Sequence, residues 1–264
     1  MLKKSPNTIL KTNNLSIGYQ QKHRQNLIAS GIEIDIQRGE LVAVIGINGV
    51  GKSTLLRTLS GIQPVLEGKV LLEDQEIHQM DSLQLASLIS LVLTEQPISR
   101  NLSVFELVAL GRQPYTNWIG RLSKADLRQI LTALKLVNIE ELQEKKCYEL
   151  SDGQMQKVLI ARALAQDTPL VILDEPTTHL DLYHKAYVMK LLKNLSRETN
   201  KAIVFASHEI NLALQLCDKI ILMQQGKVET GSPAELIKSG SFSSIFPAEL
   251  IDFDPETGSF KIKS

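Results

Sequence analysis

The sequence predicts an α/β fold built around a buried, mostly parallel sheet. Three apolar runs support this prediction, at residues 41–45, 170–173 and 202–206. Uninterrupted apolar runs of this length are typical of parallel strands that helices cover on both faces. The first run leads into residues 46–54, which fit the pattern G-x-x-x-x-G-K-[ST], and then into a helical segment from Leu55. Because a strand, a glycine-rich loop and a helix in this order form a phosphate-binding loop, we expect a phosphate-loop NTPase core.

The glycine-rich loop supplies the chemistry needed to hold a triphosphate. Its glycines let the backbone turn tightly and aim N–H groups inward, and the following helix adds the positive end of its dipole. Lys52 is expected to reach the β- and γ-phosphates, and the Ser53 hydroxyl to hold Mg²⁺. The alternative, a glycine-rich turn with an incidental lysine, leaves the flanking strand and helix unexplained. The loop residues predicted to bind the nucleotide are Gly46, Asn48, Gly49, Gly51, Lys52, Ser53 and Thr54.

The composition limits what else the chain can be. With 264 residues, 43% of them hydrophobic, it can bury the core of one domain, or of one domain with a lobe. The formal net charge is zero, so no basic field indicates nucleic-acid binding and we expect no nucleic-acid partner. No apolar run approaches the ~18 residues of a membrane span, and no hydrophobic segment follows the N-terminal lysines as in a signal peptide. Cys147 and Cys217 form no C-x-x-C pair and are expected to be buried apolar residues in a reducing compartment. We therefore expect a soluble, cytosolic chain.

Short runs on either side of the loop predict an N-terminal antiparallel β subdomain. Strands are expected over residues 8–15, 32–36 and 67–72; in the second, isoleucines alternate with acidic residues as in a half-exposed antiparallel strand. Tyr19 is expected on the loop after the first strand, where its ring could stack on a nucleotide base. Taken alone, a packed surface tyrosine is the simpler explanation of this residue.

A helical lobe is predicted to interrupt the α/β core. A strand over residues 89–93 is followed, from Leu102 to about Ala165, by apolar residues at helical spacing. Residues 111–118 are expected to form an irregular loop between two helices of this lobe. We therefore predict an inserted helical subdomain at about residues 97–165.

The remainder of the chain is expected to return to the sheet. Residues 150–154 precede a helix over 155–166, which Ser151 or Asp152 can cap. The later elements expected are a helix over 185–200, a hairpin of strands 220–223 and 227–229 around Gly226, a short helix over 233–238 and a strand over 259–262. In the segment after residue 240, the side chains of Phe242, Phe246, Phe253 and Phe260 indicate packing back on the core.

Three polar residues follow buried strands, at positions where ligands of open α/β sheets bind. Asp174 and Glu175 end the strand over 170–173, and His208 follows the strand over 202–206. Asp174 is expected to hold Mg²⁺, and Glu175 to orient and deprotonate an attacking water. His208 could donate a hydrogen bond to the γ-phosphate or hold Glu175 in place. In isolation these residues also fit a solvated strand end and a structural histidine, but their order after a phosphate loop favours phosphoryl transfer.

Taken in order, these features resemble the ATP-binding-cassette (ABC) ATPases over residues 8–240, which leaves 241–264 as a short C-terminal extension. Residues 150–156 (LSDGQMQ) are similar to the Leu-Ser-Gly-Gly-Gln signature of that family, with Asp152 in place of a glycine. Residues 177–181 (TTHLD) resemble its dimer-contacting loop, and Tyr19 matches its adenine-stacking aromatic residue. The resemblance therefore implies ATP as the nucleotide, with Mg²⁺.

The resemblance also implies two further groups of site residues. Family members carry a catalytic, Mg²⁺-contacting glutamine after the strand that enters the helical lobe; either Glu95 or Gln96 could occupy that place, and we choose Gln96. The family forms a head-to-tail dimer, in which ATP on one subunit is capped by the signature of the other, here Ser151, Gly153 and Gln154. A helix start in a separate lobe is suited to this role, because its unpaired N–H groups favour anions.

Within the family, a single cassette without a membrane span resembles the detached ATPase subunit of a bacterial-type importer. Residues 102–115 (LSVFELVALGRQPY) are similar to the same segment in ATPases of iron-chelate importers, which serve ferric siderophores, haem and cobalamin. The implied partners are a second copy of the chain, multi-span permease subunits and, indirectly, a periplasmic or lipoprotein solute-binding protein. The implied location is the cytoplasmic face of the inner membrane. The alternatives are an importer of a metal ion or another small solute, and a non-transport ABC regulator; a GTPase lacks support because no Asn-Lys-x-Asp motif is present.

Overall fold

The computed structural model describes residues 7–21, 24–93, 100–246, 249 and 251–262. Its main sheet has the strand order β11-β10-β4-β9-β8-β7, and the five strands from β10 to β7 in this order are parallel. Only β11 joins antiparallel, through the hairpin with β10. The mostly parallel sheet that we expected is therefore confirmed. The strands are β4 (Leu41–Ile45), β7 (Ile89–Val92), β8 (Leu170–Asp174), β9 (Ala202–Ser207), β10 (Lys219–Gln224) and β11 (Lys227–Gly231).

Alternate residues of the parallel strands face two different cores. In β4, Leu41, Ala43 and Ile45 pack into the core that contains α6 (Leu182–Thr199), α7 (Ile210–Leu216) and the helical lobe. Val42 and Val44 face the opposite core, with α1 (Lys52–Leu59) and the antiparallel sheet. Burial on both faces explains why β4 is apolar at every position.

The predicted N-terminal antiparallel β subdomain is confirmed, with two corrections. It consists of β1 (Thr8–Gln21), β2 (Arg24–Ile32), β3 (Asp35–Gln37), β5 (Glu67–Leu72) and β6 (Gln75–Glu76). The strand expected over 32–36 is divided between β2 and β3, because the buried Thr12 hydroxyl bonds the backbone between them: it donates to Ile32 O and accepts from Ile34 N, each at 2.8 Å. Tyr19 is not on a loop, because β1 continues past it and pairs Tyr19 with Asn26 of β2.

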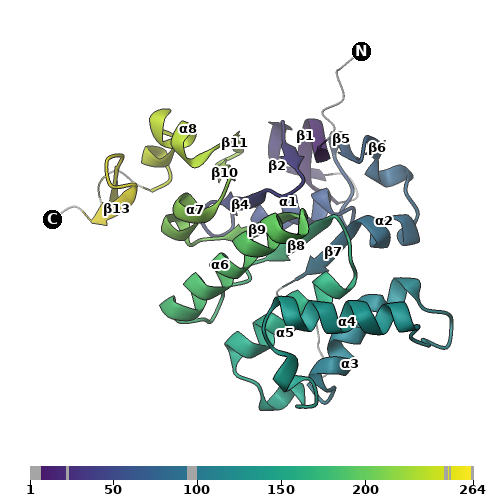
Figure 1. The fold of residues 1–264 in the computed structure, drawn as a ribbon. Coiled ribbons are helices and arrows are strands. Elements are labelled where there is room, and N and C mark those ends of the chain that lie inside the picture. Colours follow the sequence, from purple (N-terminus) through teal and green to yellow (C-terminus); the bar gives the residue numbers. More distant parts are fainter. Residues whose placement is uncertain (1–6, 22–23, 94–99, 247–248, 250, 263–264) are drawn as a thin grey trace.

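The inserted helices form a separate group below the sheet in Figure 1. They are α3 (Val104–Ala109), α4 (Lys124–Leu136) and α5 (Asp152–Ala165), with the 3₁₀ segments η2 (Leu110–Tyr115), η3 (Glu140–Leu142) and η4 (Cys147–Glu149). The irregular loop expected over 111–118 is for the most part the ordered segment η2. Gly111 lets η2 approach α5, since a Cβ there would lie 2.2 Å from Arg162 O.

A buried ion pair joins η2 to both long helices of the lobe. Arg112 Nε donates to Asp126 Oδ1 of α4, and Arg112 Nη1 donates to Ala165 O at the end of α5, each at 2.8 Å. The guanidinium also lies 4.0 Å from the centre of the Tyr115 ring. These contacts fix η2 in place, which sequence periodicity could not reveal.

The remaining elements lie at the edges of the molecule. The phenylalanines of the C-terminal segment contact one another in a chain of tilted and edge-to-face rings, with ring centres 5.2 Å (Phe242–Phe253), 5.0 Å (Phe253–Phe260) and 5.1 Å (Phe246–Phe260) apart. Phe242 and Phe253 are buried in the larger core, so the expected packing back on the core is confirmed.

No helix in the described ranges combines the length and apolar character needed to cross a bilayer. The other elements are η1 (Ile77–Gln79), α2 (Ser82–Leu88), α8 (Pro233–Lys238), η5 (Ser241–Ser244), β12 (Ile251–Asp254) and β13 (Ser259–Ile262).

Candidate nucleotide site

The loop between β4 and α1 has a shape that requires glycine at three positions. Gly49 and Gly51 have φ values of +79° and +109°, which L side chains rarely adopt. A Cβ on Gly51 would lie 2.4 Å from Cγ2 of Ile28, and one on Gly46 would lie 2.6 Å from Met223 O. The loop is therefore a tight backbone cradle, and residues of β2 and β10 pack directly against its glycines.

A buried cation lies within this cradle. The Lys52 side chain is 5% exposed, and its Nζ donates to Gly46 O at 3.0 Å and to Ile47 O at 3.3 Å. Burial lowers the pKa of Lys52, whereas the charges of Glu175 and Asp174 oppose that shift. A lysine whose partners are loop carbonyls can exchange them for phosphate oxygens without moving far.

The end of β8 brings two carboxylates to the same place. Ser53 Oγ donates to Asp174 Oδ1 at 3.1 Å, so a hydroxyl and a carboxylate oxygen lie side by side. Burial raises the pKa of Asp174, and the hydrogen bond from Ser53 opposes the rise. Mg²⁺ prefers hard oxygen ligands of these two kinds, together with phosphate oxygens and water. The residues present therefore fit a magnesium ion.

Glu175 is held by its own backbone and by a threonine. Its φ of +49° is unusual for a non-glycine residue, and its N–H donates to Ala206 O at 3.2 Å. Thr178 Oγ1 donates to Glu175 Oε2 at 3.0 Å, while Oε1 lies 4.0 Å from Lys52 Nζ. Strained backbone of this kind persists where surrounding contacts fix it, and it often occurs at functional sites.

Lys52, Ser53 and Glu175 line one open cavity of about 610 Å³, whereas Asp174 lines a second cavity on the other side of Glu175. Tyr19 stands at the rim of the first cavity, with its hydroxyl 2.9 Å from Thr54 Oγ1. Asn26 and Ile28 of β2 also line the cavity, and the sequence did not indicate either residue because β2 itself was not predicted. Their place follows only from the pairing of β2 with β1. The lining residues are Tyr19, Asn26, Ile28, Asn48, Gly49, Gly51, Lys52, Ser53, Thr54 and Glu175.

The start of α5 lies outside this cavity. Ser151, not Asp152, is the N-cap: its Oγ accepts from Gln154 N at 3.3 Å, and Gln154 Oε1 accepts from Ser151 N at 3.1 Å. One face of α5 borders a second cavity of about 300 Å³ beside Asp174 and Glu175. That face consists of Asp152, Met155, Gln156 and Leu159 and does not include Ser151, Gly153 or Gln154.

Gly153 instead packs against the first turn of α6. A Cβ at this position would lie 2.9 Å from Cδ2 of His184. The His184 ring is itself held, because its Nδ1 lies 2.9 Å from both carboxylate oxygens of Asp181. The turn at residues 151–154 is thus braced by the start of α6.

Two expected site residues are not joined to the others. The side chain of His208 is 45% exposed, and its Nε2 lies 3.5 Å from Glu209 Oε1. No ion pair within the described ranges connects His208 to Glu175, so the expected contact that would hold Glu175 is not formed, and Thr178 takes that role. Gln96 and its alternative Glu95 lie outside the described residues.

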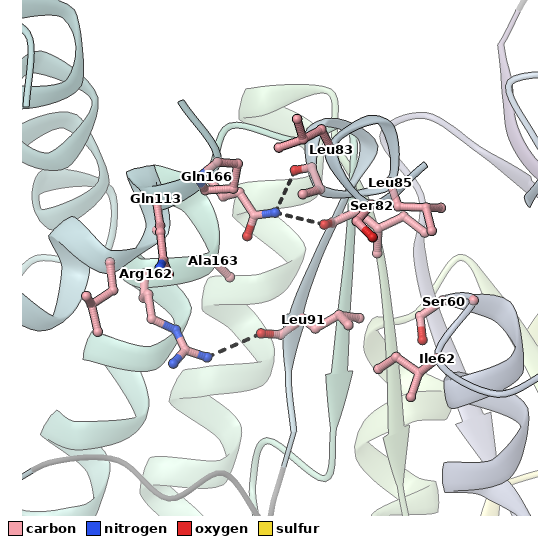
Figure 2. A pocket seen from close by; sticks show the side chains of 16 residues that line it. Ser60, Ile62, Ser82, Leu83, Leu85, Leu91, Gln113, Arg162, Ala163 and Gln166 are labelled. Atoms are coloured by element: carbon pink, nitrogen blue, oxygen red, sulfur yellow. Dashed lines mark hydrogen bonds between the residues drawn. The ribbon is translucent and has the colours of Figure 1, made fainter. Parts of the chain in front are cut away.

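A third cavity, of about 670 Å³, lies between the core and the helical lobe (Figure 2). Gln166 at the end of α5 donates to Ala86 O at 2.7 Å and to Ile89 O at 2.9 Å, and Arg162 donates to Leu91 O at 3.4 Å. These bonds tie α5 to α2 and β7 across the floor of the groove. Its rim carries the exposed apolar side chains of Ile62, Leu83 and Leu110.

The fold and the cradle together define a phosphate-loop nucleotide site at the carboxyl edge of a parallel sheet. The family model described as "ABC transporter" matches residues 29–178, more than half of the chain. The chain therefore belongs to the ABC family and is an ATP-binding-cassette ATPase.

Related proteins agree with this assignment over nearly the whole chain. An uncharacterized ABC transporter ATP-binding protein of Methanocaldococcus jannaschii, MJ0873, is 40% identical, with 97% of this chain and 87% of that protein covered. The petrobactin import ATP-binding protein YclP of Bacillus subtilis is 38% identical, covering 83% and 88%. The iron(3+)-hydroxamate import ATP-binding protein FhuC of the same species is 36% identical, covering 94% and 91%.

Solved structures share the fold. A putative metal-chelate type ABC transporter in an inward-facing conformation matches with a TM-score of 0.76 and 30% identity, covering 91% of this chain and 89% of that one. The cassette MJ0796, in a dimeric post-hydrolysis state with ADP and phosphate, matches with a TM-score of 0.72 and 29% identity, covering 85% and 99%.

Proposed function

We propose that the cavity beside the phosphate loop binds ATP and Mg²⁺ and that Glu175 is the general base for hydrolysis. The observation that carries this proposal is the position of the Glu175 carboxylate, which lines the same cavity as the phosphate loop and lies 4.0 Å from Lys52 Nζ. Lys52 and the loop N–H groups hold the β- and γ-phosphates, Tyr19 packs on the adenine, and Ser53 and Asp174 hold the metal. When bound, Mg²⁺ neutralises developing charge on the phosphate oxygens. Glu175 orients a water molecule and accepts its proton, while His208 and Gln96 retain their proposed roles beside the γ-phosphate and metal.

We further propose that two copies of the chain enclose the nucleotide. Ser151, Gly153 and Gln154 line neither cavity beside Glu175 in their own chain, which leaves them free to cap ATP held by a second copy. A helix N-terminus with a serine cap suits a phosphate group. The relative MJ0796 was crystallised as a dimer with ADP and phosphate, which supports the same arrangement here.

The transport role follows from the relatives. We propose that the chain energises uptake of an iron chelate, a ferric siderophore or haem, or of cobalamin, because YclP and FhuC are named for petrobactin and ferric hydroxamate import. The similarity of residues 102–115 to iron-chelate importers supports the same cargo class. An importer of another small solute, or a non-transport ABC regulator, is the second candidate.

The groove of Figure 2 is the proposed docking site for the permease. It lies between the ATPase core and the helical lobe. Its lining includes Leu110, Gly111, Gln113 and Pro114, which belong to the segment 102–115 that is similar to ATPases of iron-chelate importers. A cytoplasmic helix of the permease would cover the exposed apolar rim. In this proposal residues 8–240 form the ATPase domain, with 97–165 as its helical subdomain and 241–264 as an extension, and the chain works at the cytoplasmic face of the membrane. A solute-binding protein would act through the permease alone.

Uptake in a deletion strain tests the cargo, with labelled ferric siderophore, haem and cobalamin supplied in turn. We expect the wild-type chain to restore uptake of one iron chelate or of cobalamin and Glu175→Gln to fail. Co-purification tests the partner: wild type should retain the permease, and Leu83→Asp at the groove rim should lose it while still binding ATP. A chain that hydrolyses ATP but captures none of the candidate permeases would favour the regulator.

A further inference from the structure

The loop between η2 and α4 presents two large apolar side chains to solvent. Trp118 is 94% exposed and Ile119 is 68% exposed. In Figure 1 this loop projects beyond the end of α4, on the same side of the molecule as α2. A tryptophan and an isoleucine exposed side by side at a loop tip leave most of their apolar area uncovered by the chain, which indicates a role outside it.

The tip has a defined conformation. Asn117 Oδ1 accepts hydrogen bonds from Ile119 N at 3.2 Å and Arg121 N at 3.1 Å, and Gly120 N donates to Asn117 O at 2.8 Å. Gly120 has a φ of +73°, which completes the turn. An asparagine-centred turn of this kind orders the backbone without help from Trp118 or Ile119. The hydrogen-bonded turn at Asn117 thus holds the two apolar side chains toward solvent.

Within the loop and α4, the exposed charged side chains are all of one sign. Between residues 116 and 136 the exposed charged side chains are Arg121, Lys124, Arg128 and Lys135. The carboxylate in this segment, Asp126, is buried and bonded to Arg112. Leu127 and Leu131 are also partly exposed on α4, at 39% and 50%. Since the whole chain has a formal net charge of zero, this basic segment is a local feature.

We propose that Trp118, Ile119 and these four basic side chains form a membrane-contact surface that binds anionic lipid headgroups. Tryptophan favours the boundary between water and hydrocarbon, where its ring is buried and its N–H stays near polar groups. Lysine and arginine side chains are attracted to the negative surface potential of a cytoplasmic leaflet. The combination at one loop and the adjoining helix matches both properties of such a surface.

Charge favours lipid over the permease as the occupant. Cytoplasmic loops of membrane proteins carry an excess of lysine and arginine, so they would be repelled by a segment with four exposed cations. The orientation rests on the proposed function: η2 lines the docking groove through Leu110, Gly111, Gln113 and Pro114, and the tip follows three residues later. A permease seated in that groove would bring the tip toward the bilayer, where it would steady the cassette during its cycle.

Trp118 provides a direct probe, because it is the single tryptophan of the chain. Tryptophan emission of the full chain is measured with vesicles of phosphatidylcholine alone and with vesicles that also contain phosphatidylglycerol. We expect a blue shift, and quenching by brominated lipid, with the anionic vesicles only, and reversal of both at high salt. No change, or an equal change with neutral vesicles, would overturn the proposal. A shift that needs detergent-solubilised permease and no lipid would assign the surface to a protein partner instead.

Matched variants separate charge from folding. Lys124→Ser with Arg128→Ser keeps the tryptophan and removes two of the four cations, so we expect about thirtyfold weaker vesicle binding. Lys190→Ser with Arg197→Ser removes two exposed cations from α6 and should bind vesicles as the wild type does. Both variants should keep the basal ATPase rate. Because vesicle binding requires no transporter, its failure would leave the proposed importer function untouched, and a failed uptake test would leave this result standing.

Discussion

Lys52 is a buried ammonium group whose described partners are two carbonyl oxygens of its own loop and, at 4.0 Å, a carboxylate. Such a group attracts a phosphate anion through its full positive charge and can donate hydrogen bonds to the phosphate oxygens. We expect Lys52→Ala to lose nucleotide affinity by about a hundredfold, which corresponds to one charge-assisted hydrogen-bonded contact of about 3 kcal/mol. Titration with a fluorescent ATP analogue measures this, and Lys69→Ala, an exposed lysine of β5, is the control. Unchanged binding by Lys52→Ala would contradict the role of the loop.

Gly153 is a position where a contact within the same chain, with His184, leaves room only for glycine. It has ordinary helical backbone, so alanine would otherwise be tolerated, yet the added Cβ would press on the His184 ring that Asp181 holds. Either the His184 ring or the start of α5 must therefore shift to admit the methyl group. We expect Gly153→Ala to lower ATP turnover at least several-fold and His184→Ala in the same chain to restore part of it. If the second substitution restores nothing, while His184→Ala alone is active, the requirement for glycine comes from the partner's nucleotide instead.

At the scale of elements, the Arg112–Asp126 pair fixes the packing of η2 on α4 and α5. Hydrogen bonds from Ser123, and the Arg112 guanidinium, hold the pKa of Asp126 below its ordinary value of 3.8. A lowered carboxyl pKa stabilises the folded state above the ordinary value, and that contribution is lost as the pH falls through the folded-state pKa.

Chemical unfolding across pH tests this pair. We expect Asp126→Asn to be less stable than wild type by a constant margin from pH 7 to about pH 5, and the margin to shrink below the ordinary pKa of 3.8. Glu141→Gln, which removes an exposed carboxylate from η3, should show no such change. A margin that is independent of pH would mean that shape, not charge, makes Asp126 necessary.

Elements were predictable from the sequence where their burial is simple. The fully buried β4 and the short α8, with its serine cap and N-terminal proline, have the predicted bounds. The helix α2 was not predicted because it buries no residue and so has no apolar period. The division of β2 from β3 depends on Thr12, a polar side chain from another strand, and no local pattern carries that information. For the same reason, the phosphate loop and both carboxylates could be identified by motif, whereas Asn26 and Ile28 could not.

At the scale of the whole molecule, the site in one chain holds the phosphate loop and the proposed base, Glu175, but not the signature turn. Glu175→Gln removes the proposed proton acceptor while keeping the size and the hydrogen bond from Thr178. We expect it to bind ATP, to lose at least ~100-fold of its turnover, and to accumulate as a dimer when ATP and Mg²⁺ are present. Size-exclusion chromatography with and without ATP measures the dimer, and Glu198→Gln on the exposed side of α6 is the control. Wild-type turnover by Glu175→Gln would refute the assignment of the base.

The strand order of the main sheet has a consequence for how the chain is made. The two sheet neighbours of β4 are β9 and β10, and both are encoded far beyond the helical lobe. During synthesis the phosphate loop therefore leaves the ribosome early, but β4 lacks both of its parallel neighbours until β9 and β10 have emerged, as far as Gln224. Met223, which presses on Gly46, is added at the very end of that interval. A nascent chain stopped before β10 should be unable to gain stability from ATP, so the nucleotide can stabilise only a chain whose parallel strands are all present.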